Sequence, residues 1–468
     1  MKKFFCIVFS CLMLISLAAC TGRSRPDNTA APTAANNTQA ANTQEAEATA
    51  GAERVPDLSC NKETDFDRRL IMNGNDNTVL ETDDVYYFLP RMDHFMRWCE
   101  KDGSVYGVLC GKPECEHDGG NGEETNTDCN GYLGSMPQRY SWIADGKLYY
   151  VEAYGSVHDP ESCAKIYRMD LDGTDHEFVR AVPTPNTQYG VNMGVGNFCY
   201  HRGILYFTMS CGYIEGAEPS QPFLAAALPL DGEEIKIIHD SGPIMTFFGS
   251  IYPIGECCYI FEYGSDRKPN YTKIMRWDSV TEKTSIIYEG DELGIIVRFW
   301  IGEDGVIYAA SKYEDGVGQK ALLRFKDGEW EEVMSFEDAE ISYSIRSVSD
   351  GIVIARDYRG YESDMDRDID LWIRKFDGET LYRGKLPMAW IGELEEKYGG
   401  HVKFNDSLLF CGNEHELLCV YDTLLPKPAG REYAPQCRVL VRYDITDEGL
   451  SEVRLCEARE WIIEDYFG

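Results

Sequence analysis

The residues with the clearest chemical potential are three cysteines and a histidine in one short segment. They are spaced Cys110-x4-Cys115-x-His117-x11-Cys129, among many Gly, Asp and Asn residues. Three thiolates and an imidazole match the ligand set of a closed tetrahedral zinc site. Such ligands could order a segment that has little hydrophobic content of its own. The spacing therefore predicts a structural zinc site, because four protein ligands leave no open coordination position for catalysis.

No catalytic constellation can be recognised elsewhere in the sequence. A Gly-x-Ser-x-Gly elbow, a phosphate-binding glycine loop and a His-Glu-x-x-His run are all missing, so hydrolase and nucleotide-dependent chemistry have no motif support. The eight histidines are scattered, and none lies at a recognisable spacing from a candidate nucleophile: His94, His117, His158, His176, His201, His239, His401 and His415.

A unit of four short strands recurs along residues 57–468 and must position these side chains. In the best copy, strands over 140–144 and 147–154 are joined by Asp145-Gly146, and strands over 165–170 and 177–182 by Asp172-Gly173. The first turn recurs at Asp83-Asp84, Asp145-Gly146, Arg202-Gly203, Ile254-Gly255, Asp304-Gly305, Asp350-Gly351 and Asn405-Asp406. The second recurs at Asp102-Gly103, Asp172-Gly173, Asp231-Gly232, Asp278-Ser279, Asp327-Gly328, Asp377-Gly378 and Glu448-Gly449. The chain thus holds seven approximate copies of one pattern.

An arginine recurs just before the second turn in six of these units. Its place in the repeat indicates a structural role, in which it pairs with acids on neighbouring strands, because functional residues lie more often on variable loops. The six positions are Arg97, Arg168, Arg276, Arg324, Arg374 and Arg442.

The repeat predicts an all-β fold, a β-propeller of seven four-stranded blades. A four-stranded sheet that is apolar on both faces cannot stand alone, and radial repetition packs each sheet against its neighbours. A helix is expected only over 393–398, between the sixth and seventh units. The pattern is similar to that of the TolB-like propellers and of propeller lipoproteins of Gram-positive bacteria, a resemblance that implies a fold rather than an activity. A pair of β-sandwiches is the structural alternative, but it predicts no seven-fold period.

In such a ring the first strand of each unit lines the central channel. This would place Trp142, Arg298, Trp300 and Arg346 near the channel wall. Aromatic planes with a few cations suit a sugar or peptide ligand, and we predict a ligand-binding role for these four residues. Core packing is the alternative explanation for the same residues.

The first twenty residues carry an export signal. Two lysines precede an apolar run over residues 4–17 that is too short to span a membrane. The run ends in Leu17-Ala18-Ala19-Cys20, which resembles the bacterial lipobox. This resemblance implies that residues 1–19 are removed, that the Cys20 thiol is lipidated, and that the chain is anchored at the extracytoplasmic face of the cell membrane. Residues 20–56 lack large aliphatic and aromatic side chains almost throughout, so we expect a disordered tether.

This extracytoplasmic address leaves two interpretations of the cysteine cluster open. Cysteines outside the cytoplasm are commonly oxidised, so Cys115 could form a disulfide with Cys110 or Cys129 instead of binding zinc. The sequence has 17 cysteines, of which Cys6 and Cys11 leave with the signal peptide and Cys20 carries the lipid. The remaining number is even, which favours disulfides, whereas the ligand types favour zinc.

Charge restricts the partners of the mature protein. The net charge is −34, and removal of Lys2 and Lys3 with a signal that contains no acid makes it −36. Such an acidic surface excludes nucleic acid as the expected partner. Two function classes remain. We expect a cell-surface binding or scaffolding module for a glycan, peptide or partner protein, and the alternative is an extracytoplasmic propeller enzyme that acts on glycans with paired carboxylates.

Overall fold

The residues from Val55 onward form one compact unit in a computed structural model of the chain. The predicted signal peptide, Cys20 and most of the predicted tether lie outside the described residues. None of the described helices is long and apolar enough to cross a membrane. The structure describes residues 54–61, 63–69, 78–89, 94–117, 126–134, 137–153, 162–185, 193–211, 222–242, 245–265, 270–291, 299–302, 305–310, 320–336, 343–349, 351–357, 369–427 and 434–460.

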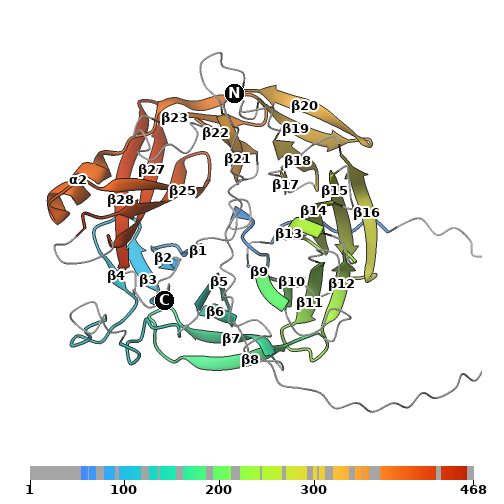
Figure 1. The fold of residues 1–468 in the computed structure, drawn as a ribbon, viewed down its shortest axis with the longest axis horizontal. Coiled ribbons are helices and arrows are strands. Elements are labelled where there is room, and N and C mark those ends of the chain that lie inside the picture. The colour runs from blue at the N-terminus through green and yellow to red at the C-terminus, as the bar shows by residue number, and fades with distance from the viewer. Residues whose placement is uncertain are drawn as a thin grey trace, which may run out of the picture. The chain divides into compact units, whose positions relative to one another are not determined.

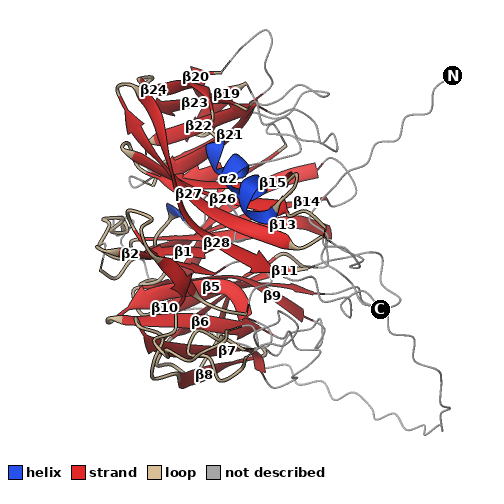
Figure 2. Cartoon of the chain, turned by 90° about the vertical axis from the view of Figure 1, so that its left-hand side faces the viewer, coloured by secondary structure: helices blue, strands red, loops and turns tan. Residues whose placement is uncertain are grey.

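Seven four-stranded antiparallel sheets are arranged in a ring (Figure 1), which confirms the predicted seven-bladed propeller. Each sheet takes four strands that are consecutive in the chain, and the first of the four lies innermost. In the side view of Figure 2 almost every described element is a strand. We number the blades 1 to 7 in chain order.

The first four blades contain strands β1 to β16. Blade 1 consists of β1 (Thr78–Glu81), β2 (Val85–Leu89), β3 (Arg97–Glu100) and β4 (Tyr106–Val108). Blade 2 consists of β5 (Pro137–Ala144), β6 (Lys147–Ala153), β7 (Ser162–Asp170) and β8 (Glu177–Pro183). Blade 3 consists of β9 (Met193–His201), β10 (Ile204–Cys211), β11 (Phe223–Pro229) and β12 (Lys236–Asp240). Blade 4 consists of β13 (Met245–Ile254), β14 (Cys257–Ser265), β15 (Asn270–Asp278) and β16 (Lys283–Gly290).

The last three blades contain strands β17 to β28. Blade 5 consists of β17 (Phe299–Ile301), β18 (Ile307–Ala310), β19 (Ala321–Lys326) and β20 (Glu329–Ser335). Blade 6 consists of β21 (Tyr343–Ser349), β22 (Ile352–Asp357), β23 (Asp370–Lys375) and β24 (Thr380–Lys385). Helix α2 (Ala389–Tyr398) precedes blade 7, which consists of β25 (Lys403–Gly412), β26 (Glu416–Leu424), β27 (Gln436–Thr446) and β28 (Gly449–Glu460).

The recurring turns have the backbone conformation that tight hairpins need. At Asp145-Gly146 both residues have positive φ, 51° and 71°, and at Asp327-Gly328 the values are 53° and 90°. Positive φ at both central residues matches the right-handed twist of the flanking strands, and Asp-Gly adopts it at low cost. Thirteen of the fourteen predicted turns separate consecutive strands of one blade.

The predicted first turn of the seventh unit is wrong. Asn405-Asp406 lies inside β25, where the pairing register shifts between Asn405 and Leu409, as at a bulge. The true turn follows β25, and its signal is a different asparagine. The side chain of Asn413 accepts hydrogen bonds from the N–H groups of His415 and Glu416. An Asx turn of this kind reverses the chain without a glycine.

Hydrophobic side chains fill the spaces between adjacent blades. One cluster joins Trp142 and Val151 of blade 2 to Phe207 of blade 3. Another joins Trp300 of blade 5 to Val353 of blade 6. Each sheet therefore buries its faces against its neighbours, which is the physical reason why the repeat closes into a ring.

Helix α2 lies where the sequence predicted one, but it begins four residues earlier, at Ala389. Its first turn has no local side-chain cap. The carboxylate of Glu452 on β28 instead accepts hydrogen bonds from the N–H groups of Ala389 and Trp390. The indole of Trp390 is fully buried and packs on Tyr421. Because this cap comes from a residue far along the chain, local sequence signals could not locate the start of the helix.

At least two of the six recurring arginines form ion pairs with acids on neighbouring strands, as the repeat predicted. Arg168 contacts Glu177 and Arg324 contacts Glu331, in both cases directly across a pair of neighbouring strands. Arg442 pairs with Asp444 of its own strand. Arg374 differs, because it donates to the carbonyls of Ser335 and Gly378 and lies over aromatic rings.

A segment before the first blade runs along the turns between the first and second strands of several blades. It contacts blades 3, 4, 5 and 1. We call residues 57–69 the strap, with residue 62 outside the described part. Asp57 and Glu256 exchange hydrogen bonds of 2.8 Å, and the Arg202 guanidinium binds Asp65 at 2.6 Å. A Cβ on Gly255 would lie 2.2 Å from the Asp57 carbonyl oxygen, so only glycine fits there. Further contacts join Arg68 to the Ile301 carbonyl and Arg69 to Glu81.

Buried His201 of β9 ties the strap to blades 3 and 4 in its neutral form. Its Nδ1 accepts the N–H of Phe66 at 3.0 Å, so Nε2 carries the proton and donates to the Gly255 carbonyl at 2.8 Å. Burial lowers the pKa of His201 below its ordinary value. Protonation would therefore cost the hydrogen bond to the strap as well as desolvation.

Lowering the pH through 6.5 should destabilise the protein, and His201→Gln should reduce this effect. In this range the unfolded histidine binds a proton that the folded one does not. The free energy of unfolding therefore decreases as the pH is lowered. The slope from this one group is at most about 1.4 kcal/mol per pH unit. Urea unfolding at pH 7.5 and 5.5 measures it. Equal losses in the wild type and in His201→Gln would contradict the assignment.

Candidate metal centre

The four predicted ligands lie on the connection between blades 1 and 2. β4 ends at Val108, and the N–H of Leu109 then donates to the Met96 carbonyl, which holds the chain beside β3 as it enters the connection. At its other end, the N–H of Leu133 donates to the His94 carbonyl, and the N–H of Met96 donates to the Gly131 carbonyl. Both ends of the connection are therefore fastened to blade 1.

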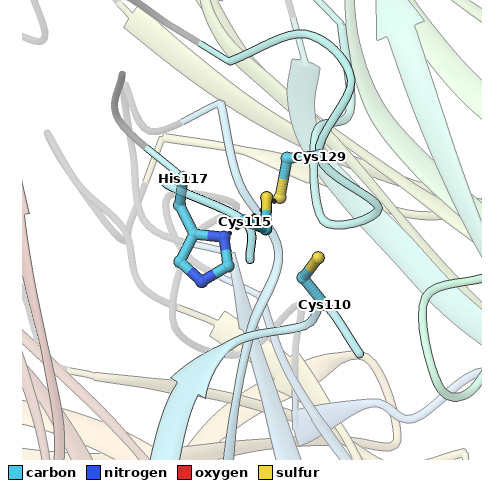
Figure 3. A group of neighbouring side chains, drawn as sticks. All are labelled: Cys110, Cys115, His117 and Cys129. Carbon is cyan, nitrogen blue, oxygen red and sulfur yellow. Dashed lines mark hydrogen bonds between the residues drawn. The ribbon is translucent and has the colours of Figure 1, made fainter. Parts of the chain in front are cut away.

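The four side chains converge on one point, as the sequence predicted (Figure 3). The Sγ atoms of Cys110, Cys115 and Cys129 and a ring nitrogen of His117 all lie within 4.8 Å of one another. His117 Nδ1 lies 3.3 Å from Cys129 Sγ. A zinc–sulfur bond of about 2.3 Å places two ligands of a tetrahedron about 3.8 Å apart. The observed spacing therefore fits a tetrahedral ion with little rearrangement.

N–H groups point at all three sulfur atoms. The N–H of Gly131 donates to Cys129 Sγ at 3.4 Å, and the side-chain amide of Asn126 donates to Cys115 Sγ at 3.6 Å. Cys110 accepts from the backbone N–H groups of Lys112 and Asn130. Such donors stabilise negative charge on sulfur, so the surroundings are prepared for thiolates.

The protonation of the three thiols shows why a cation would bind here. Burial, together with the neighbouring Cys115 and Cys110, raises the pKa of Cys129 to about 12. Burial works against ionisation of Cys110 as well, but hydrogen bonds from the backbone N–H groups of Lys112 and Asn130 and from the other two cysteines together lower the pKa of that thiol. Three thiolates in one place therefore need a positive ion among them, which a divalent metal supplies.

The centre is partly buried and contacts two blades. Phe95, Val108 and Tyr132 pack around the cysteines, and Cys129 is 5% exposed. On the blade 2 side, Nε2 of His176 lies 2.7 Å from the carbonyl oxygen of Asn130. An ion at this position would join the two ends of the connection between the blades. With four protein ligands its role would be structural.

Among the described residues, this is the one group of three or more Cys, His, Asp or Glu side chains whose ligand atoms converge in this way. Cys110, Cys115 and Cys129 are free thiols, so the described residues of this cluster contain no disulfide. The sulfur-directed donors Asn126, Gly131 and Lys112 were not predicted. Asn126 stands three residues before Cys129, but a lone Asn in a polar segment gives no clear signal.

The predicted ligand-binding residues do not form one described site. Trp142 and Trp300 are 5% and 2% exposed and belong to two different core clusters, and Trp142 stacks between Tyr149 and Tyr200. Core packing, the alternative from the sequence, accounts for both indoles. Arg346 lies half-buried on β21. Arg298 lies outside the described residues, as does the lipidation residue Cys20.

No family model and no curated protein matches this chain. Several solved structures resemble it. The β-propeller domain of the Trilobed protease from Pyrococcus furiosus is 12% identical, with 81% of this chain and 97% of that chain covered and a TM-score of 0.43. TolB from Acinetobacter baumannii is 13% identical, with coverage of 82% and 81% and a TM-score of 0.32. An acylaminoacyl peptidase from Pyrococcus horikoshii is 14% identical with a TM-score of 0.42. The match covers 84% of this chain but only about half of the peptidase, 54%.

Proposed function

We propose that Cys110, Cys115, His117 and Cys129 hold one Zn²⁺ that joins the two ends of the connection between blades 1 and 2. The observation that carries this proposal is the convergence of three sulfur atoms and one imidazole within 4.8 Å, with N–H donors directed at every sulfur. A disulfide would use two of the three thiols and leave the third beside it. Zinc uses all four ligands and neutralises the thiolate charge.

Cobalt substitution tests the ligand set. Full-length protein stripped of metal and titrated with Co²⁺ should develop the thiolate-to-cobalt charge-transfer bands and intense d–d bands of a tetrahedral sulfur-rich site. An equivalent of Zn²⁺ should abolish them. Cys163, a buried cysteine of blade 2, provides the matched control, so Cys163→Ala should leave the spectrum unchanged. A weak octahedral spectrum would exclude the proposed centre.

We propose further that the propeller is a lipoprotein held at the extracytoplasmic face of the cell membrane. The support is the sequence of residues 1–20, which ends in the lipobox-like Leu17-Ala18-Ala19-Cys20. Metabolic labelling with a fatty acid should tag the wild-type protein and place it in the membrane fraction. Cys20→Ala should carry no label and leave that fraction. A labelled Cys20→Ala protein would refute lipidation at this position.

We propose that the propeller acts as a binding or scaffolding module for an extracellular glycan, peptide or protein. The strap contacts the first turns of blades 3 and 4 and the Ile301 carbonyl of blade 5, so we expect a ligand at the opposite face of the ring.

Each buried acid among the described residues has a partner inside the protein. Glu262 binds His239 and Tyr271, and Glu152 binds Tyr167. Asp278 accepts hydrogen bonds from the N–H groups of Val280 and Thr281, and Glu457 binds Lys397 and Arg454. These contacts favour structural roles for the acids over catalysis.

A glycan and peptide array probed with the full-length protein tests the binding role. The expected result is saturable retention of one ligand class without chemical change. The alternative, a glycan-active enzyme, predicts new reducing ends or unsaturated sugars after incubation with the bound glycan. Product formation would replace the binding role by the enzymatic one.

A further inference from the structure

Within the described strands, the ring closes between blades 7 and 1 without a shared strand. Every described blade takes its four strands from one stretch of chain, so no hydrogen-bonded sheet spans the joint between the last blade and the first. Side-chain packing makes the closure instead. One hydrophobic cluster joins Tyr86 and Phe88 of blade 1 to Leu440 and Leu455 of blade 7. Opening the ring at this joint would break packing but no strand pairing.

Two cysteines face each other across this joint. Cys99 lies on β3 of blade 1 and Cys456 on β28 of blade 7, and both belong to the cluster that closes the ring. Their exposed fractions are 0% and 1%. The two side chains pack in the same cluster where β28 contacts β3, and the neighbouring Cys99 thiol together with burial raises the pKa of Cys456 well above its ordinary value. β28 passes so close to blade 1 that a Cβ on Gly103 would lie 2.9 Å from the Arg454 carbonyl oxygen.

We propose that Cys99 and Cys456 are a disulfide site that covalently closes the propeller. The oxidant is the disulfide of a small thiol or of a thiol–disulfide oxidoreductase. One cysteine thiolate attacks it, giving a mixed disulfide and releasing one thiol. The second cysteine thiolate then displaces the other thiol, so the Cys99–Cys456 bond forms and two electrons pass to the oxidant. Both thiols are buried in the closed ring, so the reaction takes place during folding, before blade 7 docks.

The bond would act at a joint that the described residues hold by side-chain packing and by the hydrogen bond from Arg442 to the Lys101 carbonyl, without strand pairing. It would link residues near the two ends of the propeller and restrict the unfolded chain over most of the domain, which gives a large entropic effect in the loop-closure description. In the cell, the step rests on the proposed extracytoplasmic address, where disulfides persist. The experiment below supplies the oxidant directly, so a wrong address would not affect its result.

Oxidative refolding of the full-length chain tests the proposal. The zinc-loaded protein is unfolded in guanidinium chloride and refolded either with oxidised and reduced glutathione or with dithiothreitol. Free thiols are then alkylated, and linked peptides are identified by mass spectrometry. We expect a Cys99–Cys456 linked peptide only after refolding with glutathione, and a Tm higher by about 5 °C than that of the reduced protein.

Single variants separate the bond from general effects of losing a buried thiol. Cys456→Ala and Cys99→Ala should lose the oxidant-dependent shift in Tm. Cys419→Ala, which removes another fully buried thiol of blade 7, should keep it. The mass spectrum of the wild type decides the question even if a variant fails to fold. Alkylated Cys99 and Cys456 after oxidative refolding, or linkage of either to a different cysteine, would overturn the proposal.

Discussion

Replacing Cys129 with alanine should reduce the affinity for zinc far more than 100-fold and remove the stabilisation that zinc provides. Loss of an outer-shell partner already costs about 10- to 100-fold, and Cys129 is proposed as a direct ligand and contacts His117. A site that binds only the folded chain adds about 4 kcal/mol when free zinc exceeds its Kd about 1,000-fold. For a domain of this size the difference corresponds to about 5 °C in Tm.

The measurement is the Tm of each protein at buffered zinc concentrations and after treatment with a strong chelator. Wild-type Tm should rise with zinc and fall on chelation, whereas that of Cys129→Ala should respond to neither. Cys163→Ala removes an equally buried thiol from blade 2, so it should keep the zinc response even if its own Tm is lower. A wild-type Tm that is unaffected by chelation would show that no metal stabilises the connection.

Replacing Asp422 with alanine should destabilise the protein by about 3–5 kcal/mol, because it strips the acid from a buried arginine. Asp422 and Arg438 are directly opposite on β26 and β27 of blade 7, and they form an ion pair. Only 3% of the Arg438 side chain is exposed. A guanidinium left in this position without its carboxylate keeps its charge at every accessible pH, so it cannot escape the desolvation cost by losing a proton.

Chemical denaturation of Asp422→Ala measures this loss. Glu177→Ala is the matched control, because Glu177 and Arg168 are also directly opposite on neighbouring strands but are 49% and 40% exposed. Solvent already screens the exposed pair, so its loss should change stability little. Equal effects of the two substitutions would show that burial does not decide the energy of these pairs.

The fold could be predicted from the sequence because its information is local and repeated. Pairs such as Asp145-Gly146 determine a turn within two residues, and seven copies of a turn–strand pattern leave few alternatives to a ring. One error occurred where a distant residue decides, because the start of α2 depends on Glu452. The other error was local: the turn between β25 and β26 depends on the side chain of Asn413 rather than on a glycine pair. The strap could not be predicted at all, because its partners lie on the turns of distant blades.

The ligands of the candidate metal centre were also predictable, but the choice between zinc and a disulfide was not. Spacing alone cannot show whether three sulfur atoms and an imidazole meet, or whether N–H groups such as that of Gly131 point at them. The predicted ligand-binding role of the two tryptophans was not supported. Trp142 and Trp300 were placed on first strands correctly, but alternation along a strand also sends side chains into the spaces between blades, where both indoles are buried.

Zinc content together with a thiol count on the full-length protein, purified without chelators, tests the central claim most directly. We predict one zinc ion per chain, and thiols of Cys110, Cys115 and Cys129 that resist alkylation until the metal is removed and then all react. A metal-free protein in which two of these three cysteines are joined by a disulfide would contradict it.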